Sequence, residues 1–174
     1  DVEASQLAEN FWEVALPMSM ASTSVRSPYF STFLVAQIHS NARGFLSKNV
    51  TVASMIEEVG DIHHIVPKNY LIKHGINDRN DYNQIANYAL TETPVNIAIK
   101  DRAVADYMSL IDAQIEDSTL RLGEITSAEE LAANLSANAI PAGFRETTAD
   151  TYAEFLSERR YLMAQVIRAY YNSL

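Results

Sequence analysis

The stretch DIHHIVPKNYLIKHGIND, residues 61–78, decides which fold the sequence predicts, because its character differs from that of the segments around it. Its apolar residues are mostly β-branched or aromatic, and such residues favour strands. Pro67 interrupts the stretch, and HGINDRND at 74–81 is typical of a turn. We therefore expect extended structure that is broken at Pro67 and turns at 74–81.

A second strand and a helix are expected to follow. NYALTE, residues 87–92, has the composition of a short strand. Thr93 followed by Pro94 favours a helix start, because the fixed φ of proline suits the first helical position. The sequence therefore predicts a small two-strand-plus-helix insert over residues 61–100.

Helical patterns surround this insert. Apolar residues recur at helical spacing, Pro17 is expected to end the first helix, and Gly60 suits the end of the third. The expected helices span 4–16, 29–42, 51–59, 103–117, 127–140 and 148 onward. The predicted fold is mostly α with a small β insert (α+β), in a single domain that covers residues 1–174.

The composition narrows the functions that are open to the chain. Its 174 residues include no cysteine, which excludes disulfides, thiolate metal sites and thiol nucleophiles and fits a cytoplasmic protein. No apolar run is long enough for a membrane span, and no signal peptide is recognisable at the start. The first residue is not Met, so we expect the chain to be the C-terminal part of a longer protein.

The charge is strongly negative overall but not around the insert. A formal net charge of −9 argues against nucleic-acid binding, which needs local positive potential. Acidic and basic side chains balance over residues 61–102, whereas acidic side chains dominate residues 103–154. A nucleic-acid site within the insert therefore remains compatible with the composition.

The insert also holds the residues best suited to chemistry. His63 and His64 are adjacent, and Asp61 lies two residues earlier, on the strand face of His63, where it is a metal ligand or orients one. Asn87 precedes the second strand, and Asn96 lies near the helix start. Each residue alone has an ordinary structural explanation, such as a local hydrogen bond at a turn. The occurrence of all of them together, in this order along the chain, is much rarer than that of any one residue alone.

Residues 61–101 resemble the HNH (His-Me finger, ββα-metal) nuclease motif. The resemblance lies in two segments, DIHHIVPKNYL and IANYALTETPVNIAIKD. The flanking segments are similar, more loosely, to the C-terminal nuclease region of GmrSD-type modification-dependent restriction endonucleases. The resemblance implies a helical body around a ββα-metal motif. It also implies a metal-dependent DNA endonuclease of restriction or anti-phage defence, with nucleotide handled by a separate N-terminal domain.

The resemblance also implies a role for each motif residue. His64 matches the general base, and Asn87 matches the residue that fastens the loop between the strands. His63 and Asn96 match metal ligands, although many relatives carry Asp at the position of His63. Lys100 matches a frequent downstream cation.

The implied chemistry is coherent with these residue types. A histidine can take a proton from water at neutral pH. Imidazole and amide oxygen ligands suit Mg²⁺ or Mn²⁺, would also take softer ions, and leave positions open for water and phosphate. Lys68 or Lys100 is a candidate phosphate contact, and for each a purely solvated lysine is an equal alternative. Two other functions stay open: an inactive HNH-like helical interaction module, and an RNA nuclease.

Overall fold

The computed structural model describes residues 7–58 and 61–174, and at Asp61 it describes the backbone alone. The elements as far as the second strand are η1 (Phe11–Ala15), α1 (Leu16–Ser19), α2 (Pro28–His39), α3 (Val52–Glu57), β1 (Asp61–His64), α4 (Lys68–Lys73), α5 (Arg79–Tyr82), η2 (Ile85–Asn87) and β2 (Tyr88–Thr91). The later elements are α6 (Thr93–Ile99), α7 (Val104–Asp117), α8 (Ala128–Ala137), η3 (Ala142–Glu146) and α9 (Tyr152–Tyr171).

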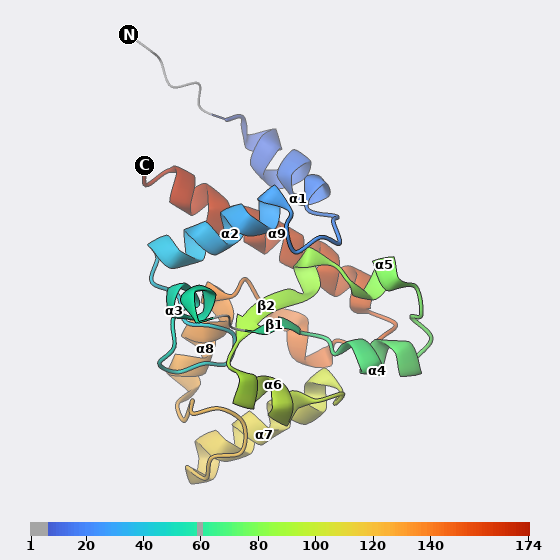
Figure 1. Ribbon diagram of the computed structural model, residues 1–174, viewed down its shortest axis with the longest axis vertical. Helices are drawn as coiled ribbons and strands as arrows, with labels where there is room; N and C mark the ends of the chain where they lie inside the picture. The colour runs from blue at the N-terminus through green and yellow to red at the C-terminus, as the bar shows by residue number, and fades with distance from the viewer. Residues whose placement is uncertain (1–6, 59–60) are drawn as a thin grey trace.

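The described chain is mostly helical and carries a small antiparallel sheet of β1 and β2 (Figure 1). In the sheet His63 lies opposite Ala89, and His64 lies opposite Tyr88. Helix α6 begins at Thr93, directly after β2, with Pro94 in its first turn. These features confirm the predicted fold class in its coarse form, a helical chain with a two-strand-plus-helix insert.

Side-chain caps explain several helix starts. The hydroxyl of Thr51 accepts a hydrogen bond from the Ser54 backbone N–H (3.1 Å), which confirms the expected start of α3. Ser127 accepts from the N–H groups of Glu129 and Glu130 and starts α8 in the same way. The last helix begins at Tyr152, later than expected at 148. The expected end of the third helix at 59–60 lies outside the described residues.

The prediction that Pro17 ends the first helix is wrong. Residues Phe11–Ala15 form a π-helix, and α1 continues from it through Pro17 to Ser19. Pro17 has no N–H to donate, and the helical run continues past it for only two residues, to Ser19. The second helix ends at His39, before the expected residue 42, because Asn41 adopts the left-handed conformation with φ 55°.

The expectation of extended structure beyond Pro67 is also wrong, since Lys68–Lys73 is the helix α4. Tyr70 and Leu71 are buried, whereas Lys68 and Lys73 are exposed. One buried face on this six-residue segment is compatible with a short helix. Packing of Tyr70 and Leu71 in the core therefore outweighs the strand preference that the composition of the stretch indicates.

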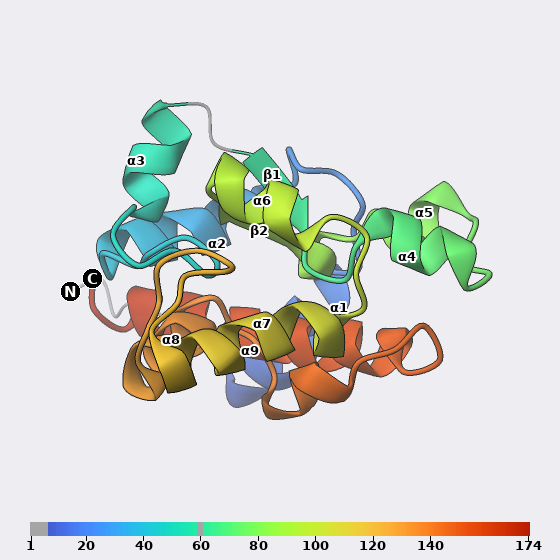
Figure 2. The same cartoon turned by 90° about the horizontal axis from the view of Figure 1, so that it is seen from below.

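The insert and the later helices share one core. Figure 2 shows β1, β2 and α6 on one side of the molecule, and α7, α8 and α9 on the other. Ala89 of β2, Ile99 of α6, Met108 of α7 and Met163 of α9 belong to the same buried apolar cluster. Helix α9 also packs along α1 and α2. The insert therefore packs on the helical body through a shared apolar core.

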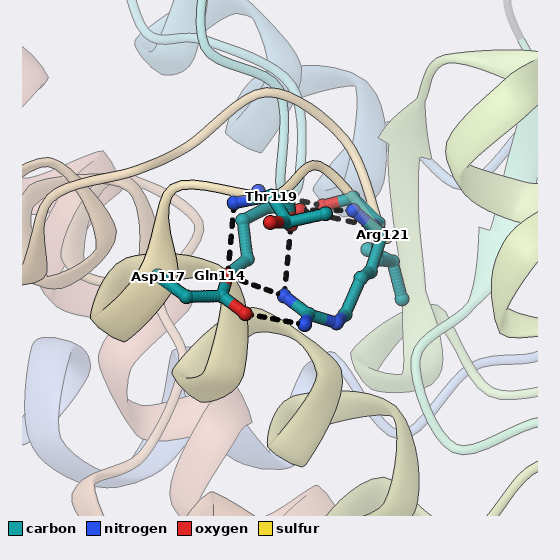
Figure 3. Close-up of polar contacts among 5 residues, drawn as sticks. Gln114, Asp117, Thr119 and Arg121 are labelled. Atoms are coloured by element: carbon teal, nitrogen blue, oxygen red, sulfur yellow. Dashed lines mark hydrogen bonds and ion pairs between the residues drawn. The ribbon is translucent and has the colours of Figure 1, made fainter.

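The turn that follows α7, within the acidic residues 103–154, is held by local hydrogen bonds (Figure 3). The buried amide of Gln114 accepts from the backbone N–H of Arg121 (2.5 Å) and donates to the carbonyl of Ile125 (2.6 Å). Asp117 and Arg121 form a two-bond ion pair (2.7 and 2.6 Å), and this pairing lowers the pKa of the Asp117 carboxyl. These side chains therefore hold the turn between α7 and α8 in place.

Within residues 7–58 and 61–174, no helix is both long and apolar enough to cross a membrane.

Candidate active site

His63 and Asn96 are brought together by the packing of α6 on β1. The Nδ1 atom of His63 lies 2.6 Å from Oδ1 of Asn96, so the ring N–H donates to the amide oxygen. His63 is buried, with 4% of its surface exposed, and its ring stacks on Phe45 at 6.1 Å. Two residues that lie 33 positions apart, both expected to be metal ligands, therefore place donor atoms side by side.

His64 has a different set of neighbours. Its Nε2 lies 2.9 Å from Oδ1 of Asn83, and its ring meets the ring of Tyr88 edge-on at 5.2 Å. Neighbouring residues of a strand point to opposite faces, so His63 faces Asn96 and His64 faces Asn83. No described interaction joins His64 to Asn96.

The surroundings of His64 favour its neutral form. Burial lowers the pKa of the ring below its ordinary value, the hydrogen bond with Asn83 raises it, and the positive charge of Lys68 lowers it. The net effect is a lowered pKa. The neutral ring, which can accept a proton, therefore predominates at neutral pH.

Asn87 fastens the chain after β1. It is fully buried, and its Oδ1 accepts from the N–H of Val66 (2.8 Å) while its Nδ2 donates to the carbonyl of the same residue (3.0 Å). A further N–H···O contact of 3.5 Å reaches the carbonyl of Tyr82. The side chain thus behaves like a short strand partner for Val66, two residues beyond His64.

Arg159 of α9 holds the backbone on either side of Asn87. Its guanidinium is fully buried and donates to the carbonyls of Ala86 and Tyr88, both at 2.8 Å, and to that of Asn138 at 3.1 Å. Burial lowers the pKa of Arg159 to about 9, which leaves the group charged at neutral pH. Arg159 therefore holds the backbone on both sides of Asn87.

The two candidate phosphate contacts lie on different sides of the site. Lys68 begins α4, is exposed, and places its ammonium 5.2 Å from the ring centre of Tyr82. Lys100 follows α6 and is also exposed; its N–H donates to the Asn96 carbonyl at 3.1 Å. Lys68 is therefore the candidate phosphate contact on the side of His64, and Lys100 is the one on the side of His63 and Asn96.

The donor atoms fit a divalent cation in part. Imidazole nitrogen and amide oxygen are ligand types that Mg²⁺ or Mn²⁺ accepts, and a cation bound by Nδ1 of His63 and Oδ1 of Asn96 would replace the hydrogen bond between them, with Nδ1 unprotonated. Among the described residues no three His, Cys, Asp or Glu side chains gather into a metal-binding group. The side chain of Asp61, the third expected ligand, lies outside the description, although its backbone pairs with Thr91.

Two residues with clear roles in this region were missed from the sequence. Asn83 stands in a segment with several other Asn residues, so nothing distinguishes it by type. Arg159 does carry a signal, because it interrupts the apolar face of α9 four residues after Phe155 and four before Met163. A charged residue in the middle of a buried helix face indicates a specific buried partner.

The chain matches no family model, and neither a curated protein nor a solved structure matches it.

Proposed function

We propose that the chain is a metal-dependent endonuclease domain of the HNH (His-Me finger) class that hydrolyses DNA. The observation that carries the proposal is the hydrogen bond of 2.6 Å between His63 on β1 and Asn96 on α6. It joins the first strand and the helix of a ββα unit through the two residues to which the resemblance gives metal ligation. The particular biological setting we propose is restriction or anti-phage defence of the GmrSD type.

The residues divide the work of phosphodiester hydrolysis. His64 accepts the proton of the attacking water, a role that suits a half-buried histidine with a lowered pKa. His63 and Asn96, with Asp61 as a third candidate, would hold Mg²⁺ or Mn²⁺, and the bound cation would supply Lewis-acid stabilisation of the phosphate and the leaving oxygen. Asn87 keeps the segment after His64 in place through Val66.

Substrate contacts are expected from Lys68 and Lys100. Both are exposed and lie on elements that also carry or contact the histidines. An ammonium group near the scissile phosphate neutralises charge, and such contacts weaken steeply with salt. The negative net charge of the chain opposes long-range attraction of DNA, so a further domain of a longer protein would have to supply most of the affinity.

One observation favours a second function, an inactive helical interaction module that keeps the fold. His63 is almost fully buried, and its Nδ1–H already pairs with the amide oxygen of Asn96, as in a purely structural polar pair. Cation binding separates the two functions, since a structural pair has no affinity for a divalent ion.

Plasmid nicking tests the proposal. The purified chain is incubated with supercoiled DNA, and in parallel with a structured RNA, in Mg²⁺, in Mn²⁺ and in EDTA. We expect metal-dependent nicking of DNA. Cleavage of RNA alone would transfer the proposal to an RNA nuclease, and no cleavage of either substrate, together with no cation binding, would favour the inactive module.

A further inference from the structure

Asn83 is the polar partner of His64, and its backbone is fixed from several directions. It follows α5, and its N–H donates to the carbonyl of Arg79 at 3.1 Å. Tyr82, the residue before it, is buried, and its carbonyl accepts from the hydroxyl of Tyr152 at 3.4 Å. Two residues later, the N–H of Ile85 donates to the Ser22 carbonyl at 2.8 Å. The amide of Asn83 is therefore presented from a rigid segment.

The contact between Asn83 and His64 determines which ring nitrogen carries the proton. The atom that faces Nε2 is the amide oxygen Oδ1, which only accepts hydrogen bonds, at 2.9 Å. Nε2 must therefore carry the hydrogen, and in the neutral ring Nδ1 holds the free electron pair. The edge-on contact with Tyr88 restricts rotation of the same ring. The ring is thus fixed both in orientation and in tautomer.

We propose that Asn83 is a positioning residue for catalysis, which holds His64 in the Nε2–H tautomer so that Nδ1 is the atom that accepts the proton of the attacking water. This inference rests on the proposed function, because it assumes that His64 is the general base. The hydrogen bond from Nε2 to Asn83 persists when Nδ1 gains its proton, so the ring keeps its position before and after the transfer. Misplacement of a catalytic group by about 1 Å costs on the order of 100-fold in rate.

Two substitutions separate positioning from simple packing. Asn83→Leu keeps a similar volume but removes the acceptor, whereas Asn83→Asp keeps an acceptor oxygen. Asn80→Leu, at an exposed residue of α5, is the matched control. Thermal unfolding of each variant verifies that it folds before any other comparison is made.

Nitrogen-15 NMR of the histidine rings provides a readout that does not depend on activity. At a pH where His64 is neutral, we expect a slowly exchanging Nε2–H proton and an unprotonated Nδ1 in the wild-type chain. We expect that proton signal to persist in Asn83→Asp and Asn80→Leu and to disappear by fast exchange in Asn83→Leu. A wild-type His64 that carries its proton on Nδ1 would overturn the inference.

Nicking rates at saturating metal complete the test. Asn83→Leu should lower the rate about 10- to 100-fold, Asn83→Asp should restore a substantial part of it, and Asn80→Leu should leave it unchanged. Nicking by folded Asn83→Leu at the wild-type rate would overturn the inference while leaving the proposed function in place. A wild-type chain with the expected tautomer and no nicking in any metal would instead overturn the proposed function, and the catalytic role of Asn83 with it.

Discussion

Oδ1 of Asn96 on α6 lies 2.6 Å from Nδ1 of His63 on β1, and this contact ties the helix of the ββα unit to its first strand. The pair is the candidate cation site, in which His63 is buried and Asn96 is half-buried.

Substitution of the pair should change the response to metal. His63→Ala and Asn96→Ala each remove one donor atom, so we expect both to raise the Mn²⁺ concentration for half-maximal nicking by about tenfold or more. Asn96→Asp supplies a charged oxygen ligand of nearly the same shape and should lower that concentration relative to Asn96→Ala. His74→Ala changes an exposed histidine and is the control. Identical titrations in all four variants would place the cation elsewhere.

Asn87→Ala should destabilise the protein without changing its metal response. It leaves the buried N–H and carbonyl of Val66 without their side-chain partner. Each such loss costs roughly 1–3 kcal/mol, so the melting temperature should fall by several degrees. Asn77→Ala, at an exposed residue, should melt near the wild type. A normal melting temperature together with a shifted metal titration would make Asn87 a ligand.

Arg159→Met should be among the most destabilising single changes. The substitution keeps much of the side-chain volume but leaves the carbonyls of Ala86, Tyr88 and Asn138 without their donor. At roughly 1 kcal/mol or more for each buried group, we expect a loss of about 3 kcal/mol in the free energy of unfolding. Arg160→Met, one position along α9 and only half-buried, is the control. Equal urea midpoints for the two variants would show that the buried guanidinium does not support the strand.

The chain alone should cut DNA weakly and with little selectivity. Its net charge is −9, and Lys68 and Lys100 offer few phosphate contacts. We expect nicking to fall steeply between low and near-physiological salt, and nucleotide and base modification to have little effect. Strong nicking of modified plasmid alone, stimulated by nucleotide, would show that selectivity lies within these 174 residues.

The sequence predicted elements whose signals are local. Thr93–Pro94 and the capping residues Thr51 and Ser127 act on the turn that follows them, and each of these helices begins where expected. The prediction of extended structure over residues 68–73 is wrong, because the helix there depends on burial of Tyr70 and Leu71 against residues that are distant in the sequence. The helix end predicted at Pro17 is two residues early, because the π-helix and α1 form one helical run that passes through the proline to Ser19.

The candidate site could be predicted only as far as the motif reaches. The spacing of His63, His64, Asn87 and Asn96 singles out those residues, and the folded chain brings His63 to Asn96. The partners Asn83 and Arg159 depend on contacts across 19 and about 70 positions, which residue type and local spacing do not encode. Whether the assembled site is catalytic stays a prediction.

The most direct test measures cation binding and DNA nicking on the same His64→Ala protein. Calorimetry follows Mn²⁺ binding, and nicking is followed at saturating Mn²⁺, with His63→Ala and His74→Ala alongside. We expect His64→Ala to fold and to bind Mn²⁺ like the wild type, yet to nick on the order of 10²–10⁴ times more slowly, whereas His63→Ala should lose binding as well. Nicking by His64→Ala at the wild-type rate would contradict the assignment of His64 as the general base.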